Sequence, residues 1–279
     1  MKTKKLAQVF AGLATSDGDG VNMTRLIGTQ QLNSIDPFLL LDAFGSDEPN
    51  DYIGGFPSHP HRGFETVTYL LHGKMRHKDN AGNEGVIESG GVQWMTAGKG
   101  IVHSEMPEQE HGLLAGFQLW VNLPAKHKMV DPQYQEFSAD EVPVERWDNG
   151  TEIRVITGKT QQGTEGPVKN TYVSPLFMDV LLQAGKAFKQ QVDADDNTLI
   201  YVIEGEVSIG NEEQKLSTKN IGILERGDEI MVTSKADQAR FLVISAKPLN
   251  EPVARGGPFV MNTEEEIRQA FTDYRSGCF

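Results

Sequence analysis

The chain has 279 residues, with 26 lysines and arginines against 39 aspartates and glutamates, so its formal net charge is −13. A long-range field of this sign opposes direct binding to DNA or RNA. No stretch approaches the roughly 20 apolar residues that a membrane helix needs. The one cysteine, Cys278, excludes an intrachain disulfide and fits a reducing compartment. We therefore expect a cytoplasmic protein without nucleic-acid or membrane partners, in two domains because single cores rarely reach this length.

Short apolar runs between turns fill most of the chain. Residues 17–20 predict a turn, Val21–Ile27 a strand, and 38–44 a buried strand. Residues 66–71 are rich in β-branched and aromatic side chains, and 117–123 alternate strictly, which predicts one shared face for the alternate apolar residues. Many short strands without a helical period indicate a barrel or a sandwich.

The second half repeats this character after a proline-containing stretch. Residues 124–150 contain three prolines and a turn, which makes them the best candidate linker, and strand-like segments resume at residue 151. The clearest helix lies within 262–274. Thr263 is its expected N-cap, and Glu266 completes a capping box.

Two clusters of imidazole and carboxylate suggest a metal site. His59, His61 and Glu65 lie at even spacings, so on one strand they share a face; His103 and Glu105 have the same i, i+2 spacing. These ligand types suit a divalent transition metal. We expect one metal held by two strands of a β-barrel, and strand geometry alone leaves the choice between the two glutamates open. The alternative is ordinary histidines in a loop or core.

An internal repeat separates the two halves chemically. Residues 65–75 resemble 197–207 at an offset of 132, which places Gln191 at the position of His59. At a nearby offset Val232 corresponds to His103. Every histidine of the chain lies at or before His127. The repeat therefore predicts two similar barrels, of which only the first has a metal site.

Three long segments resemble the pirin family of the cupin superfamily. They are residues 59–70, residues 90–107, and residues 257–263 with the helix that follows. The resemblance covers nearly the whole chain. It implies an all-β fold of two tandem cupin (jelly-roll-like) β-barrels with a short C-terminal helix. We expect residues 1–140 to form the metal-binding barrel, and 141–279 the metal-free barrel with the helix.

The family resemblance also implies a ligand set and a chemistry. It assigns iron, as Fe(II), to His59, His61, His103 and Glu105, although other divalent transition metals accept such ligands. It implies quercetin 2,3-dioxygenase-type oxidation of a phenolic substrate by O₂. In such a reaction we expect Glu105 to accept the proton of the substrate hydroxyl. The alternative is a non-catalytic, redox-sensing protein that regulates a transcription factor or a metabolic enzyme. A third possibility, a cupin epimerase that needs no metal, ranks last. For the oligomeric state, we expect a monomer.

Several neighbours of these ligands have two interpretations each. Glu65 is either an outer carboxylate that orients a ligand imidazole or a surface residue, and Arg62 either guards the pocket mouth or faces solvent. The apolar side chains that either line a pocket or fill the core are Phe44, Phe56, Trp94, Met95 and Phe117. His72 and His77 flank a turn, where solvated side chains are expected.

Overall fold

The computed structural model describes residues 1–169, 172–235 and 237–279, and it forms two compact units. The first cupin unit comprises Leu13–Glu141 and Leu249–Phe279, and the second comprises Met1–Gly12 and Val142–Pro248. The central boundary lies next to the expected one. The units differ from the expected domains at both chain ends. The N-terminal segment Met1–Gly12 belongs to the second unit, and the C-terminal segment Leu249–Phe279 belongs to the first.

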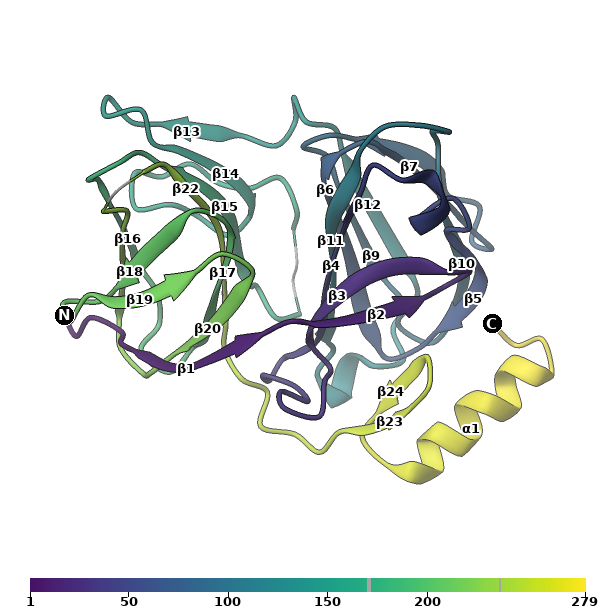
Figure 1. Cartoon of the computed structure of the whole chain (residues 1–279). Coiled ribbons are helices and arrows are strands. Elements are labelled where there is room, and N and C mark those ends of the chain that lie inside the picture. Colours follow the sequence, from purple (N-terminus) through teal and green to yellow (C-terminus); the bar gives the residue numbers. More distant parts are fainter. Residues whose placement is uncertain (170–171, 236) are drawn as a thin grey trace. The chain divides into compact units, whose positions relative to one another are not determined.

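The first cupin unit consists of two antiparallel sheets, a C-terminal hairpin and a helix (Figure 1). Its seven-stranded sheet has the order β12 (Gln133–Phe137), β9 (Val92–Thr96), β6 (Phe64–His72), β11 (Leu114–Asn122), β4 (Phe38–Ser46), β3 (Val21–Ile27), β2 (Leu13–Asp17). Its four-stranded sheet has the order β5 (Phe56–His61), β10 (Ile101–Pro107), β7 (Lys74–Asp79), β8 (Glu84–Glu88). The remaining elements are η1 (Pro49–Asp51), η2 (Ala125–His127), β23 (Ala254–Gly256), β24 (Phe259–Met261) and α1 (Glu264–Arg275).

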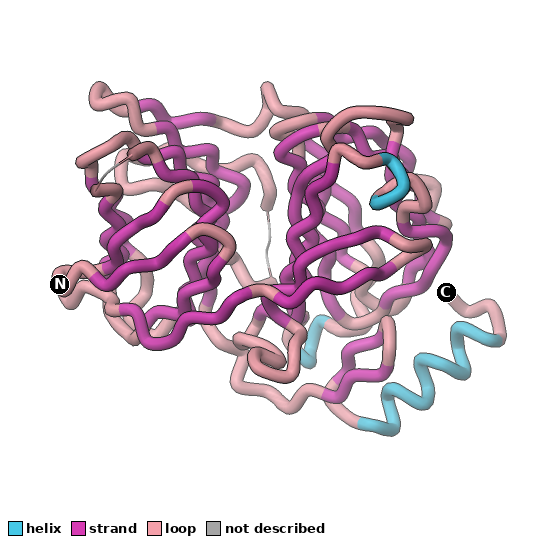
Figure 2. The backbone as a smooth tube through the Cα atoms, in the orientation of Figure 1, coloured by secondary structure: helices cyan, strands magenta, loops and turns pink. Residues whose placement is uncertain are grey.

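The second cupin unit has the same two-sheet plan. Its seven-stranded sheet has the order β1 (Leu6–Ala11), β20 (Asn220–Leu224), β17 (Asn197–Glu204), β22 (Ala239–Ala246), β15 (Leu176–Leu182), β14 (Glu152–Thr157), β13 (Val144–Arg146). Its four-stranded sheet has the order β16 (Ala187–Gln191), β21 (Glu229–Thr233), β18 (Glu206–Ile209), β19 (Gln214–Ser217). Figure 2 shows that strands make up nearly all of the regular structure.

The repeat in the sequence is a repeat in topology. The copies at residues 65–75 and 197–207 begin in β6 and β17, which lie third in their seven-stranded sheets. Strand for strand, the two sheets match, except that β12 covers the edge beside β9 whereas β1 covers the edge beside β20. An uncovered edge exposes unpaired backbone groups. The exchange of the N-terminal segment therefore closes the second unit.

The stretch 124–150 is more ordered than a linker. It contains η2, β12 and β13, and β12 pairs with β9 over five residues. The prolines of this stretch do not interrupt its strands. Pro132 and Pro143 directly precede β12 and β13, outside the paired segments.

The C-terminal helix forms as its sequence predicts. Thr263 accepts from the backbone N–H of Glu266, and the Glu266 side chain accepts from the backbone N–H of Thr263, so the capping box is complete. Ile267 and Ala270 are buried and pack with Phe259 of the hairpin. The helix thus covers its own unit. Among the described residues, no helix combines the length and apolar character needed to span a bilayer.

Candidate metal centre and its cavity

Two neighbouring strands of the first unit bring the predicted histidines together. In the antiparallel pair of β5 and β10, His103 lies opposite His59, and Ile101 lies opposite His61. The register shifts between His103 and Glu105, where β5 has one residue more than β10, so that Glu105 lies opposite Phe56. A bulge changes the direction of the side chains that follow it. The extra residue belongs to β5, so His103 and Glu105 keep the i, i+2 spacing that places both on the buried face of β10.

The three imidazole rings converge on one point. One ring nitrogen from each of His59, His61 and His103 lies within 4.8 Å of the others. The Nδ1 atom of His59 lies 2.7 Å from the carbonyl oxygen of Pro57, and that of His61 lies 3.4 Å from the carbonyl oxygen of Pro258. Each Nδ1–H therefore donates to a carbonyl, which leaves the Nε2 lone pair for the centre. The two Nε2 atoms are 3.0 Å apart.

The donor set fits a transition-metal cation. The Nε2 atom of His103 is buried and has no hydrogen-bond partner among the described residues. A buried polar atom without a partner is costly, and a cation held by three lone pairs would satisfy it. Imidazole nitrogens are ligands that first-row transition metals accept readily.

The protonation state also suits metal binding. Burial, and then repulsion from His59, lowers the pKa of His61 well below its usual value. Burial, followed by the nearby His61 and His59, lowers the pKa of His103 in the same way. Both rings are therefore neutral near pH 7, which is the form that coordinates a metal.

Glu105 lies at the same cavity but outside the histidine cluster. Its side chain accepts hydrogen bonds from the Thr68 hydroxyl and, at 3.1 Å, from the Gln118 amide nitrogen. The cluster of converging donor atoms contains only His59, His61 and His103 within the described ranges. Glu105 is buried and faces the cavity that those histidines line.

His77 is a residue of this site that the sequence analysis misplaced. Its side chain is buried rather than solvated, because alternate residues of β7 face inward. Its Nδ1 lies 3.4 Å from Nδ1 of His103, and its Nε2 lies 3.2 Å from a carboxylate oxygen of Asp79. Its ring also stacks on Tyr134 at 4.5 Å. The i, i+2 spacing of His77 and Asp79 was the available signal. His72 is exposed, as expected.

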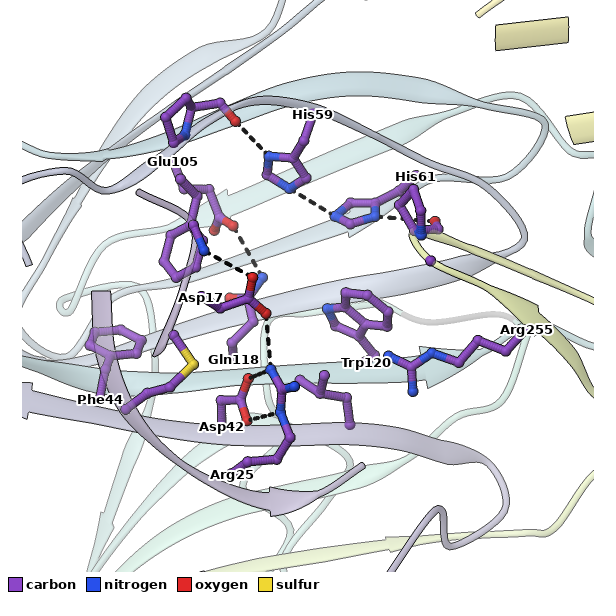
Figure 3. A pocket seen from close by; sticks show the side chains of 17 residues that line it. Asp17, Arg25, Asp42, Phe44, His59, His61, Glu105, Gln118, Trp120 and Arg255 are labelled. Carbon is purple, nitrogen blue, oxygen red and sulfur yellow. Dashed lines mark hydrogen bonds and ion pairs between the residues drawn. The ribbon is translucent and has the colours of Figure 1, made fainter. Parts of the chain in front are cut away.

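A cavity of about 530 Å³ opens beside the histidines (Figure 3). This volume falls in the range of small-molecule sites, about 300–1,000 Å³. Its apolar lining includes Met23, Leu40, Phe44, Phe56 and Trp120. Its polar lining includes Asp17, Arg25, Asp42, Gln118 and Arg255. The cavity can therefore accept an aromatic ligand with several polar substituents.

The sequence analysis missed the polar part of this lining. Arg25 donates from Nε and Nη2 to the two carboxylate oxygens of Asp42, at 2.9 and 2.8 Å, and from Nη2 to Asp17 at 3.0 Å. Figure 3 shows both carboxylates directed at Arg25. Burial raises the pKa of Asp42, and the Arg25 hydrogen bonds oppose that rise. These three residues come from β2, β3 and β4, and only strand pairing brings them together.

The alternation of β11 held a signal for the lining. Phe117, Leu119 and Val121 are buried on one face, as expected. The cavity is lined by Gln118 and Trp120 from the opposite face. Phe117 therefore belongs to the face that points away from the cavity.

The other candidate pocket residues take different places. Phe56 lines the cavity, whereas the buried Trp94 and Met95 of β9 do not. Adjacent strand residues point to opposite faces, and Met95 packs with Ala97 and Ile101. Glu65 is buried and accepts a hydrogen bond from Thr96 at 2.7 Å.

Arg62 is buried and connects the histidine strand to the C-terminus. It donates to the carbonyl oxygen of Lys99 at 2.6 Å and to Asp273 of α1 at 2.7 Å. Its guanidinium carbon lies 4.4 Å from the ring centre of Phe279. It does not line the cavity, because it follows His61 and points to the other side of the chain.

Comparison with known proteins agrees with this arrangement. The family model described as Pirin matches residues 20–121, and the one described as Pirin C-terminal cupin domain matches residues 177–279. A pirin-like protein of Caulobacter vibrioides is 51% identical over 100% of both chains. A Pseudomonas aeruginosa protein named "Putative quercetin 2,3-dioxygenase" is 45% identical, over 98% of this chain and 97% of its own. The crystal structure of a quercetin 2,3-dioxygenase from Acinetobacter baumannii has a TM-score of 0.90 at 36% identity, covering 99% of this chain and 98% of that chain.

Proposed function

This chain belongs to the pirin family, and we propose that it is a metal-dependent dioxygenase of the quercetin 2,3-dioxygenase type. Its substrates would be flavonol-like phenolics, oxidised by O₂. The observation that carries the proposal is the meeting of a metal-ligand cluster with a ligand-sized cavity: His59 and His61 belong to both. A regulator that reports the redox state of its metal through the surface needs no such cavity.

We assign the metal, Fe(II), to His59, His61, His103 and Glu105. The three convergent imidazole nitrogens support the histidine part of this assignment. Glu105 faces the same cavity, and its carboxylate is held by Thr68 and Gln118. A bound divalent metal would lower the pKa of a coordinated phenol and bring the phenolate and O₂ together.

The side chains of the site have separate roles in this proposal. Glu105 takes the proton of the flavonol hydroxyl on a carboxylate oxygen, and the Gln118 amide keeps that carboxylate in place. Phe44, Phe56 and Trp120 contact the flat rings and keep water from them. A bound flavonol is thereby presented with its hydroxyl toward the histidines.

The test is turnover of a flavonol panel by protein reconstituted separately with Fe(II), Mn(II), Ni(II), Cu(II) and Zn(II). Without O₂, the flavonol absorption band should shift on binding, and admission of air should then consume O₂. His61→Ala should abolish both effects, and Gln191→Ala in the second unit should change neither. If no metal form binds a flavonol or consumes O₂, the dioxygenase proposal fails and redox-dependent regulation becomes the better explanation.

A further inference from the structure

The cavity contains a second arginine, Arg255, which has no carboxylate within hydrogen-bond reach in the part of the chain that the structure describes. Arg255 belongs to β23 and lines the cavity. Across the described ranges, no aspartate or glutamate forms an ion pair with it; its hydrogen bond is a long one, 3.5 Å, to the carbonyl oxygen of Leu39. Arg25, by contrast, is paired with both Asp17 and Asp42. Most of the N–H donors of Arg255 are therefore available to a ligand.

An aromatic ring holds this guanidinium at the cavity. The guanidinium carbon of Arg255 lies 4.9 Å from the ring centre of Trp120, and Figure 3 shows the two side chains together. The Trp120 ring in turn lies 5.1 Å from the His61 ring. Because both distances are measured from the Trp120 ring, their sum is the largest possible separation between the Arg255 guanidinium and the His61 ring. A small aromatic molecule can span that separation.

The surroundings of Arg255 favour an anion there. The side chain remains accessible to solvent, yet desolvation, followed by repulsion from Arg25, lowers the pKa of its guanidinium, although the more distant Asp42 and Asp17 oppose this. A guanidinium that is partly withdrawn from water and has no carboxylate in hydrogen-bond contact gains from a directly bound negative partner. Arginine binds a carboxylate through two parallel hydrogen bonds, and its stacking on an aromatic ring preserves that geometry.

We propose that Arg255 and Trp120 form an anion subsite, and that the preferred ligand of the cavity is an aromatic carboxylate. Its phenolic hydroxyls lie at the histidines, its ring lies against Trp120, and its carboxylate pairs with Arg255. The orientation of the hydroxyls rests on the proposed function, whereas the carboxylate contact does not. A neutral flavonol would leave the guanidinium unpaired.

The experiment compares an acid with its neutral ester. Binding of 3,4-dihydroxycinnamate and of its methyl ester is measured by isothermal titration calorimetry without O₂, on protein that carries its metal. The acid should bind at least about tenfold more tightly than the ester, since hydrogen bonds between two charged groups are stronger than those to a neutral ester. Arg255→Gln should remove that preference, and Arg255→Lys should keep part of it because the charge remains without the planar fork.

Arg268→Gln is the matched control, since it removes one exposed arginine from the same unit. It should leave the acid-to-ester ratio unchanged. An equal affinity for acid and ester in the wild-type protein overturns the inference, and so does a ratio that survives Arg255→Gln. Either result leaves O₂ consumption with flavonols untouched. Conversely, if the protein prefers the acid but consumes no O₂, the anion subsite is supported and the dioxygenase proposal fails.

Discussion

The orientation of His103 depends on a chain of buried polar contacts. Its Nδ1 faces Nδ1 of His77, and Nε2 of His77 faces Asp79. If Nδ1 of His103 carries the proton, it donates a hydrogen bond to Nδ1 of His77. The Nε2–H of His77 then donates to the carboxylate of Asp79. Asp79 is itself held by the backbone N–H groups of Ala81 and Asn83. The chain therefore directs the Nε2 lone pair of His103 to the centre.

His77→Phe should weaken metal binding by about 10–100-fold, the usual effect of losing a partner that orients a metal ligand. Phenylalanine retains the stacking on Tyr134 but removes the acceptor for His103. Competition with a chelator measures the affinity. His72→Gln, an exposed histidine close in sequence, is the control. Equal affinities for His77→Phe and the wild-type protein would show that His103 needs no such partner.

Lys128 is a second buried residue whose role depends on hydrogen bonds. Its ammonium group donates to the carbonyl oxygens of Gly63 and Val260, at 2.8 and 2.9 Å, and to Asn122 at 2.7 Å. Lys128→Met should lower the free energy of unfolding by about 2 kcal/mol or more, because three buried acceptors lose their donor. Chemical denaturation measures this change. Lys126→Met, at an exposed neighbour, should change it little.

At the scale of elements, the histidine strand is tied to the C-terminal hairpin and helix. Val260 donates its backbone N–H to the carbonyl oxygen of Arg62, and Arg62 forms an ion pair with Asp273 of α1. A Cβ on Gly63 would lie 2.0 Å from the carbonyl oxygen of Val260, and the φ angle of Gly63 is +87°. Glycine here allows the hairpin to approach the strand. The C-terminal segment of the first unit, Leu249–Phe279, thus supports the strand that carries two of the histidines.

The tie between Arg62 and α1 should depend on pH. The hydrogen bonds from Arg62 and then Gln269 lower the pKa of Asp273 below its ordinary 3.8. The unfolded chain therefore binds this proton first as pH falls, so the contribution to stability is present at neutral pH and is lost below about pH 4. Asp273→Asn should lower the free energy of unfolding by about 1 kcal/mol at pH 7.

The measurement is the unfolding free energy of wild-type and Asp273→Asn proteins from pH 7 to 3. Their difference should shrink as pH falls. Glu265→Gln removes an exposed ion pair of the same helix and should have little effect at any pH. A difference between wild-type and Asp273→Asn that stays constant over this range would mean that the carboxylate charge contributes nothing.

At the scale of the whole molecule, two copies of one topology have different interiors. The second unit places apolar side chains, including Phe188, Ile230 and Val232, in its core. The first unit lines its cavity with three carboxylates, two arginines and two of the histidines. The same pair of sheets thus forms a packed core in one copy and a polar site in the other.

We expect one equivalent of divalent metal per chain. His61→Ala should reduce the metal content of the purified protein at least about tenfold, because only two of the three convergent imidazoles remain. Gln191→Ala, at the repeat position of His59, should leave the metal content unchanged. Plasma mass spectrometry measures the metal. Two equivalents, or loss of metal from Gln191→Ala, would contradict a single site in the first unit.

The strand-rich architecture, the repeat, the capped helix and the histidine cluster can all be read from the sequence alone. These features depend on short-range patterns: alternation in strands, fixed motif spacing, and a cap three residues from its partner. The i, i+2 spacing placed His59 and His61 on one strand face without any knowledge of the fold. The absence of histidine after His127 separated the two copies in the same way.

The contacts between distant residues, by contrast, follow from the three-dimensional fold. Arg255 reaches Trp120 across 135 positions of the sequence, and Arg62 reaches Asp273 across 211. Each end of the chain joins the unit that is formed mainly by the other half of the sequence. β1 pairs at a sheet edge of the second unit, and the C-terminal hairpin and helix belong to the first. His77 is buried because β7 pairs with β10. Long-range strand pairing and the packing of the C-terminal hairpin and helix set these contacts, and no local pattern encodes them.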